Sequence, residues 1–290
     1  MTKLWVAFAM AFSAGVYGQS YEWLKLKKYK VADLDDKVEE TSALSFYKDR
    51  LFTLNDSGNA AELYELAPQD GRLVRTYPIS GAANFDWEAL ACGGSFFYVA
   101  DIGNNWGTRQ DLKFYKVAAD SMETVETIRF YYPEQTSFVR KPQANDWDAE
   151  SAVFIDGELH LFTKEWLSYR TSHYVLPASG TGSEPVAARK LEEYPLGYVA
   201  TDAAYYDGKL YTVGYTKKME AYLTIFERDE NGRFFGGKAT KYYLGMTSSV
   251  GQIEGIAVTK EGIYISGERF HRRPFKVPQR LYFIPQTELK

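Results

Sequence analysis

The feature that most limits how this chain can fold is a short motif that recurs five times. Each copy places an acidic or hydroxyl residue directly before a run of small and apolar residues. The copies align at Ser42, Glu88, Glu150, Asp202 and Glu254, so successive copies lie 46, 62, 52 and 52 residues apart. A repeat of this length that holds several short strands is typical of one blade of a β-propeller.

Each of the first four repeats contains four short segments that favour β-strands, because they are rich in aromatic and β-branched residues. In the first repeat these segments are residues 43–47, 51–54, 62–66 and 73–79. Turn-forming pairs such as Asp156-Gly157 and Asn231-Gly232 separate the segments of later repeats. The composition agrees with an all-β protein, since aromatic residues make up 16% of the chain and include 23 tyrosines.

The fifth repeat supplies only three such segments, at residues 256–258, 263–266 and 281–284. The missing strand is available at the other end of the chain, in residues 23–31, which precede the first motif. Pairing this N-terminal strand with the last strand would close a circle. The sequence therefore predicts an all-β fold, a five-bladed β-propeller of four-stranded blades closed by the N-terminal strand.

The first 18 residues have the pattern of a secretory signal peptide. Lys3 gives a positive start, residues 4–12 are apolar, and small residues follow at Ser13, Ala14 and Gly15. The apolar run is too short to span a bilayer, which takes about 20 residues. We expect a signal peptide at 1–18, a single propeller domain at 19–290, no membrane span, and a secreted or periplasmic protein.

Charge and cysteine content exclude some classes of function. The formal net charge is −4, and no basic cluster is dense enough to predict nucleic-acid binding. Cys92 is the single cysteine, so an exported form would fold without an intramolecular disulfide. The neighbours of Cys92 in the sequence offer no base to activate it, which favours a structural role over a catalytic one.

The repeats predict that acidic residues meet at one mouth of the central channel. The innermost strand of each blade begins at this mouth and the second strand returns to it. Because side chains alternate along a strand, Asp86 should share a face with Glu88, and Asp148 with Glu150. The acidic residues expected there as metal ligands are Glu40, Asp86, Glu88, Asp148, Glu150, Asp202 and Glu254. The residues expected beside them, as contacts for a bound ligand, are Asp56, Asp101, Asn104, Asn105, Arg109, Lys164, Glu268 and Arg269.

Oxygen donors of this kind favour Ca²⁺ over Zn²⁺. Clustered carboxylates repel one another, and a bound cation would offset that repulsion. The alternative is a hydrated mouth that Lys164, Arg269 and water neutralise, and the sequence leaves both open.

Four tryptophans, Trp87, Trp106, Trp147 and Trp166, also lie close to this mouth in the predicted fold. Exposed rings could stack on a sugar or a base. Packing between blades accounts for them as readily and is the favoured interpretation for any single tryptophan.

Several motifs resemble those of a family of secreted bacterial propellers of unknown role. They are Asp86 to Ala91, Asp101 to Asn105 with Arg109, Glu150-Ser151 with Thr163-Lys164, Ala200-Thr201-Asp202, and Glu254 to Ala257. The chain is similar, more loosely, to the SdiA-regulated propellers through Glu40 to Leu44, Leu51 to Asp56 and Glu254 to Ala257. This resemblance implies a propeller that can carry a calcium site and implies no reaction. Some of these relatives have six blades, so a six-bladed ring is the alternative.

Three functions fit the predicted mouth. The first is an exported binding protein that holds Ca²⁺ and a small or polymeric ligand without catalysis. The second is a calcium-dependent hydrolase of a phosphoester, lactone or glycoside, in which Glu88 and Glu150 bind metal or transfer protons while Arg109 and Lys164 place an anion. The third is an envelope scaffold that binds a protein partner. The sequence leaves open whether the protein is an enzyme.

Overall fold

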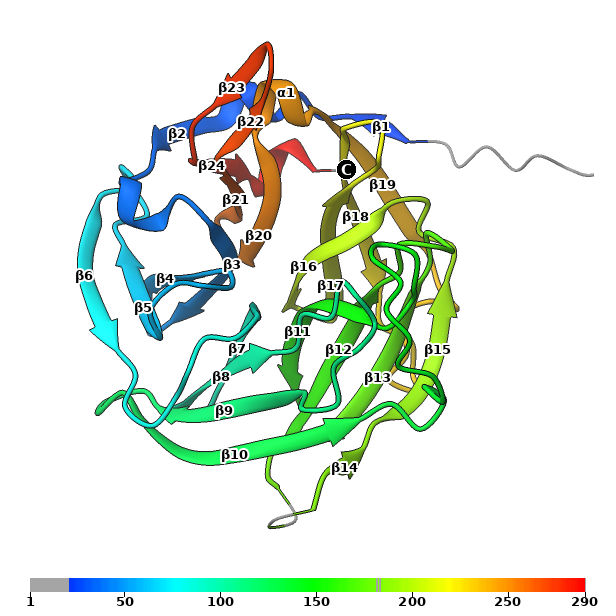
Figure 1. Cartoon of the computed structure of the whole chain (residues 1–290). Helices are drawn as coiled ribbons and strands as arrows, with labels where there is room; N and C mark the ends of the chain where they lie inside the picture. Colours follow the sequence, from blue (N-terminus) through cyan, green and yellow to red (C-terminus); the bar gives the residue numbers. More distant parts are fainter. Residues whose placement is uncertain (1–20, 181, 183, 290) are drawn as a thin grey trace, which may run out of the picture.

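The computed structural model describes residues 21–180, 182 and 184–289, and the predicted signal peptide lies outside this range. Five β-sheets stand in a ring around a central channel (Figure 1). Each sheet contributes four strands to a blade, so the prediction of a five-bladed propeller is confirmed and the six-bladed alternative is wrong. Among the described residues, no helix is long and apolar enough to cross a lipid bilayer.

The first three blades follow one another along the chain, each starting from its innermost strand. Blade 1 consists of β3 (Thr41–Tyr47), β4 (Arg50–Asn55), β5 (Glu62–Leu66) and β6 (Leu73–Pro78). Blade 2 consists of β7 (Trp87–Gly93), β8 (Phe96–Asp101), β9 (Lys113–Ala118) and β10 (Glu123–Tyr131). Blade 3 consists of β11 (Asp148–Ile155), β12 (Glu158–Lys164), β13 (Thr171–Pro177) and β15 (Arg189–Tyr194). A two-residue strand, β14 (Val186–Ala187), adds to the outer edge of blade 2 beside β10.

The last two blades use both ends of the chain. Blade 4 consists of β16 (Val199–Tyr206), β17 (Lys209–Tyr215), β18 (Glu220–Glu227) and β19 (Ala239–Met246). Blade 5 consists of β20 (Gln252–Val258), β21 (Gly262–Glu268), β24 (Arg280–Pro285) and β2 (Lys30–Asp33). The remaining elements are β1 (Glu22–Trp23), the hairpin β22 (Phe270–Arg272) and β23 (Phe275–Val277), the short helix α1 (Thr247–Val250), and the 3-10 turns η1 (Leu26–Tyr29), η2 (Asp36–Val38) and η3 (Gln286–Glu288).

The N-terminal segment closes the ring, as predicted, but it is not one strand. β2 pairs antiparallel with β24, with Ala32 opposite Leu281. Upstream of β2, η1 interrupts the predicted strand 23–31, and β1 instead pairs with β19 on the edge of blade 4. Apolar and polar residues alternate from Leu24 to Leu26, and this alternation ends at Lys27 and Lys28. A 3-10 turn then places Leu26 and Tyr29 on one side, against the same apolar cluster.

The hydrophobic core is divided among the boundaries between blades. Each of five apolar clusters combines side chains from two neighbouring blades. Between blades 1 and 2, for example, Phe52 and Phe97 are fully buried with ring centroids 4.9 Å apart. Burying one such side chain contributes about 1.5–3 kcal/mol to folding, so these boundaries hold the ring together.

Every innermost hairpin contains a β-bulge near the end that faces the predicted mouth. The pairing register shifts by one residue in all five blades, which leaves one residue of the inner strand unpaired. These bulge residues are Ser42, Glu88, Glu150, Thr201 and Glu254. In four blades, the aligned residue of the sequence motif is therefore the bulge residue. In blade 4 the bulge residue is Thr201, one position before the aligned Asp202.

The opposite end of the channel has a smaller cavity, which no described acidic residue lines. This cavity, of about 110 Å³, is lined by small and apolar side chains, including Ala91, Ala152 and Ala203. Half-buried Cys92 also lines it, and its thiol donates a hydrogen bond to the carbonyl of Phe46 at 2.9 Å. The two ends of the channel thus differ in chemistry.

Blade 3 contains a buried chain of polar groups that connects three strands. Nδ1 of His173 lies 3.0 Å from Glu192, and Nε2 of His173 lies 2.8 Å from Nδ1 of His160. If His173 donates to the carboxylate, its other nitrogen must accept, so His160 donates from Nδ1. Burial, followed by the neighbouring His173, lowers the pKa of His160 to about 3.

We predict that His160 makes stability fall in acid. The unfolded chain binds a proton below about pH 6.5, whereas the folded chain keeps His160 neutral, so folding loses about 1.4 kcal/mol per pH unit until the folded pKa is reached. His160→Asn keeps a donor near Nδ1 and removes the titration. In urea unfolding between about pH 6 and pH 4, the wild type should lose stability relative to this variant. Parallel stability curves for the two proteins would contradict the assignment.

Candidate functional site

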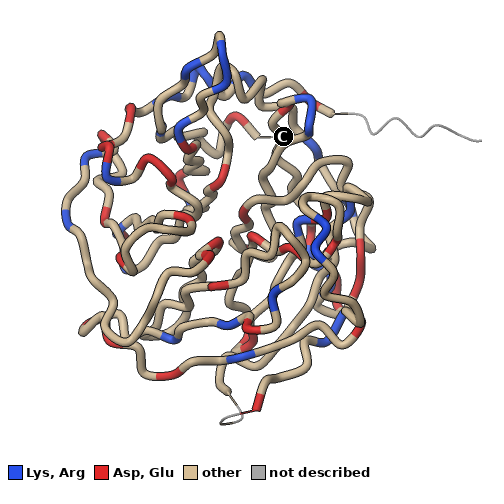
Figure 2. Tube along the Cα trace, viewed as in Figure 1, with Lys and Arg blue, Asp and Glu red and all other residues tan. Residues whose placement is uncertain are grey.

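The predicted acidic mouth is a cavity of about 480 Å³ at one end of the channel. Acidic positions lie along the inner edges of the blades around the channel in Figure 2. The bulges of four blades supply one set of lining residues, Ser42, Glu88, Glu150 and Glu254. The ends of the returning second strands supply another set, Asp56, Lys164, Tyr215 and Glu268. Two structurally equivalent positions, each occupied in four of the five blades, therefore build much of the cavity wall.

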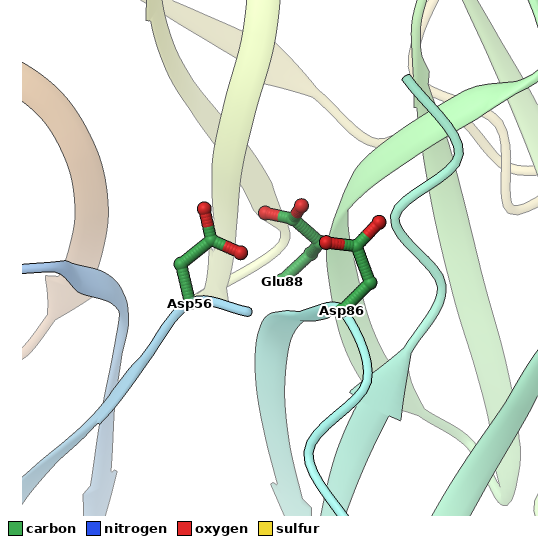
Figure 3. A group of neighbouring side chains, drawn as sticks. All are labelled: Asp56, Asp86 and Glu88. Atoms are coloured by element: carbon green, nitrogen blue, oxygen red, sulfur yellow. The ribbon is translucent and has the colours of Figure 1, made fainter. Parts of the chain in front are cut away.

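Three carboxylates from two blades form a tight group on one side of this cavity. One oxygen each from Asp56, Asp86 and Glu88 lies within 4.8 Å of the other two (Figure 3). Asp56 follows β4 of blade 1, while Asp86 and Glu88 stand at the start of β7 in blade 2. The sequence analysis expected Asp56 among the ligand contacts, and the structure brings it into the group of expected metal ligands.

Glu88 is the buried member of this group, with 3% of its surface exposed. One of its carboxylate oxygens accepts a hydrogen bond from the hydroxyl of Ser42 at 3.3 Å. Its other oxygen, Oε1, is buried and has no hydrogen-bond partner among the described residues. Leaving a buried carboxylate oxygen without a partner reduces the stability of the folded state by about 1–3 kcal/mol or more. A ligand that bound this oxygen would remove that cost.

Gly103 leaves the space that the three carboxylates occupy. A Cβ atom at this position would lie 2.5 Å from Oε1 of Glu88 and would also clash with Cγ of Asp86. The backbone of Gly103 is also fixed, because its N–H donates to the carbonyl of Asp86 at 3.1 Å. The glycine of the sequence Asp101 to Asn105 is therefore required by close approach to the acidic group.

The other side of the cavity satisfies its own charges. Lys164 forms a buried ion pair with Glu150, and its ammonium lies 4.9 Å from the ring centroid of Trp166. Glu254 accepts hydrogen bonds from the hydroxyl of Tyr215 at 3.0 Å and from the amide of Gln252 at 2.7 Å. The same amide also donates to Glu268. This half of the mouth contains an internal cation and several donors.

The electrostatics of the two sides differ accordingly. Burial raises the pKa of Glu88 well above its usual value, and the nearby Asp56 raises it further. Burial and the same neighbour raise the pKa of Asp86 to about 7. For Lys164, burial acts to lower the pKa, but Glu150 and other carboxylates outweigh it and hold the pKa well above the usual value. In the described part of the chain, Asp56, Asp86 and Glu88 form no ion pair with a lysine or arginine.

Several predicted site residues do not line the cavity. They instead hold the neighbouring loops and strands in place through hydrogen bonds and ion pairs. The carboxylate of Asp148 accepts the backbone N–H of Asn104 at 2.6 Å and the indole N–H of Trp166 at 3.0 Å. Asp101 is fully buried, with Arg109 at 2.8 Å and Lys113 at 3.2 Å. Held by these donors, Asp148 does not line the cavity that Glu150 lines.

Two predicted residues lie outside the cavity on the outer rim. Glu40 is exposed and accepts a hydrogen bond from Asn59 at 2.5 Å. Arg269 forms ion pairs with Glu39 and with Asp36, the latter at 2.7 Å. Of the two neighbouring asparagines, Asn105 lines the cavity, whereas Asn104 donates to the carbonyl of Trp147 at 3.1 Å.

Asp202 differs most from its expected place. Its Oδ2 accepts the backbone N–H groups of Ile256 at 2.7 Å and Leu44 at 3.2 Å, and its Oδ1 accepts that of Ala203 at 2.8 Å. These donors belong to blades 5, 1 and 4. Because the bulge of blade 4 falls one residue earlier, at Thr201, the carboxylate binds backbone inside the channel and does not line the mouth cavity.

The sequence analysis missed Tyr215, Gln252 and Gly103 as parts of the site. Tyr215 and Lys164 occupy equivalent positions at the ends of β17 and β12, opposite Val199 and Asp148. Aligning the second strands of the repeats, as well as the first, would have indicated Tyr215. The role of Gly103 depends on a tertiary contact, for which the sequence carries no local signal.

The tryptophans near the mouth divide between packing and exposure. Trp87 is fully buried and Trp166 is 6% exposed, so packing accounts for both. Trp147 packs partly buried against the cluster between blades 2 and 3, with its ring 5.7 Å from that of Tyr132. Trp106 is 54% exposed.

Comparisons with known proteins give no family assignment. No protein-family model matches this chain, and no curated protein matches it. Among solved structures, it resembles a putative oxidoreductase (glucose dehydrogenase) from Thermus thermophilus, with 14% identity, a TM-score of 0.47, and coverage of 88% of this chain and 98% of that one. It also resembles the Kuenenia stuttgartiensis hydrazine synthase, with 11% identity, a TM-score of 0.43, and coverage of 87% and 68%. The Pan2 WD40 domain of Neurospora crassa has 8% identity, a TM-score of 0.40, and coverage of 89% and 95%.

We predict that Asp202→Asn destabilises the ring. Asparagine offers one acceptor oxygen and turns an N–H group toward the remaining backbone donors, so a buried hydrogen bond is lost at a cost of about 1–3 kcal/mol. The measurement is urea unfolding. Asp207→Asn, in the exposed turn between β16 and β17, is the matched control and should change stability little. Equal stabilities for the two variants would contradict the view that Asp202 stabilises the ring by binding backbone N–H groups of three blades.

Proposed function

We propose that the protein is an exported propeller that binds Ca²⁺ through Asp56, Asp86 and Glu88. The observation that carries this proposal is the buried Oε1 of Glu88, which lacks a partner among the described residues and faces two further carboxylates. A divalent cation would give this oxygen a ligand and would offset the repulsion within the group.

The dimensions of the group suit this ion. Calcium binds oxygens at about 2.3–2.6 Å, so two ligand atoms on opposite sides of one ion lie about 5 Å apart. The ligand oxygens here lie within 4.8 Å of one another. Carboxylates are hard donors that favour Ca²⁺ or Mg²⁺ over Zn²⁺. Two of the three carboxylates are only half buried, and a site with solvent access suits the flexible shell of calcium.

Only one half of the mouth favours the binding of a metal cation, because the other half already contains an ion pair. Glu150 has Lys164 as its ion-pair partner. The carboxylates of Asp56, Asp86 and Glu88 form no ion pair with a described lysine or arginine, and Lys164 and Arg109 act on their pKa values only from a distance. The predicted signal peptide would deliver the protein to a compartment outside the cytoplasm, where calcium modules with weak dissociation constants of about 0.1–1 mM are occupied.

We further propose that the cavity beside this group holds a small or polymeric ligand without chemical conversion. Binding is favoured over the hydrolase alternative because groups suited to acid–base work already hold one another. Lys164 is paired with Glu150, and the hydroxyl of Tyr215 donates to Glu254. The envelope scaffold alternative would use the outer rim and does not account for Oε1 of Glu88.

Calcium should stabilise the wild type, because a ligand that binds only the folded state raises its stability. At a hundred times the dissociation constant the gain is about 2.7 kcal/mol, which corresponds to an increase in Tm of about 5 °C for a domain of this size. Glu88→Gln and Asp86→Asn should abolish this increase in a thermal melt. In chelator, Glu88→Gln should melt at or above the wild-type temperature, since it removes a buried repulsive charge.

Asp207→Asn serves as the control, because it removes one carboxylate at the far end of blade 4. It should keep the full calcium response. A wild type that shows no calcium response, or a Glu88→Gln variant that keeps it, would contradict the proposed site.

Gly103→Ala tests the geometry without removing a carboxylate. The added methyl group would displace the side chains of Asp86 and Glu88, so we expect calcium affinity to fall about tenfold or more, measured by calorimetric titration. Gly236→Ala is the control, because a Cβ there meets only one side-chain atom, at 3.8 Å. Unchanged affinity in Gly103→Ala would show that these two carboxylates do not bind the ion.

A further inference from the structure

A second cavity, of about 500 Å³, adjoins the acidic mouth. Most of its wall comes from two segments, the connection between β6 of blade 1 and β7 of blade 2 and the loop between β8 and β9. Ser57, from the loop between β4 and β5 of blade 1, completes it. It shares Asp86 with the three-carboxylate group and Asn105 with the mouth cavity. We call this second cavity, with Phe85 and Trp106 in its wall, the aromatic groove.

Two large aromatic side chains in this groove are exposed to solvent. Phe85 is 65% exposed and Trp106 is 54% exposed, and both line the same cavity. A single exposed aromatic residue is ordinary on a protein surface. Two in the wall of one cavity, on separate loops, form an apolar surface that a ligand can contact.

The loop that carries Trp106 is held rigidly, although the ring itself is exposed. The backbone carbonyl of Trp106 accepts the N–H of Lys141 at 2.9 Å, and that of Asn105 accepts the N–H of Gln143 at 2.9 Å. The buried side chain of Gln135 donates to the carbonyl of Gly107 at 3.0 Å. These bonds fix the residues on both sides of the ring, so little conformational entropy would be lost when a ligand binds to it.

One face of Trp106 already has a partner. The guanidinium of Arg140 lies 4.2 Å from the ring centroid, which orients the indole. The remainder of the ring lines the groove, as does Phe85 on the opposite loop.

The polar lining of the groove favours a neutral ligand that both donates and accepts hydrogen bonds. It contains the carboxylates of Asp86 and Asp111, together with Asn105 and Thr108. The guanidinium of Arg109 is engaged by Asp101 at 2.8 Å and by Asp111 at 3.0 Å. Two further cations lie against the rings, since Lys113 is 5.1 Å from the ring centroid of Phe85 and Arg140 stacks on Trp106. Charges of both signs therefore offset one another around the groove, which favours a neutral ligand over an ion.

We propose that the aromatic groove binds a neutral carbohydrate chain. A pyranose ring has an apolar face of C–H groups that can pack on Phe85 and Trp106, and hydroxyls that can donate to Asp86 or Asp111 and accept from Asn105. The shared Asn105 allows such a chain to continue toward the acidic mouth. This proposal does not require calcium, so it goes beyond the cation site.

The test is calorimetric titration of the full mature chain with neutral hexasaccharides, namely β-1,4-linked glucose, xylose, mannose and N-acetylglucosamine and α-1,4-linked glucose. We expect at least one to bind with a Kd below about 1 mM, in chelator as well as with calcium. Trp106→Ala should weaken that binding about tenfold or more, and Phe85→Ala should also weaken it. Trp23→Ala is the matched control, because Trp23 is a 68% exposed tryptophan on blade 4 and should not affect binding.

Three results would overturn the carbohydrate proposal, of which the first two concern the hexasaccharides. One is the absence of binding by all of these hexasaccharides, and the other is equal binding by Trp106→Ala and the wild type, with both proteins melting at the same temperature. Tighter binding of a single-stranded oligonucleotide than of any hexasaccharide would also overturn it. The calcium melt separates the two proposals, since Trp106→Ala keeps all three carboxylates and should keep the full calcium response.

Discussion

The pairing of β2 with β24 is the interaction on which the rest of the structure depends. It joins the two ends of the described chain in one sheet, with Ala32 opposite Leu281, and so turns a row of blades into a ring. Together with the apolar cluster between blades 5 and 1, it fixes Glu254 and Glu268 of blade 5 relative to Asp56 of blade 1. Asp202 supports the same closure from inside the channel, because its carboxylate binds backbone N–H groups of blades 1, 4 and 5.

Most of the fold could be predicted from the sequence because its signals are local. Alternating apolar residues and turn pairs locate strands, and β5 lies at residues 62–66 as predicted. The interval between repeats fixes the number of blades once four strands are counted in each. The prediction was wrong for residues 23–31, where two buried leucines resemble a strand. The two lysines that follow end the alternation, and a 3-10 turn packs better there.

The candidate site was less predictable because it depends on bulges and loops. A bulge shifts the pairing register of each inner strand by one residue. The bulge falls at Thr201 in blade 4 and at Glu150 in blade 3, and the sequence motif does not reveal this difference. The earlier bulge in blade 4 explains why Asp202 binds backbone N–H groups. Asp148 is kept from the mouth by its own partners, the N–H groups of Asn104 and Trp166. Asp86 and Glu88 did come together as predicted, and Asp56 joined them because the second strand of blade 1 returns to the same end.

One half of the mouth is neutralised by the ion pair of Lys164 with Glu150. In the other half, carboxylates face one another and form no ion pair with a described lysine or arginine. The central claim is that a calcium ion completes the second half. The most direct measurement is a crystal structure of the mature protein grown with Ca²⁺. We predict an ion between Asp56, Asp86 and Glu88, with Oε1 of Glu88 among its ligands. A well-ordered mouth with no ion there, and with a water molecule or a lysine bonded to that oxygen, would contradict the account.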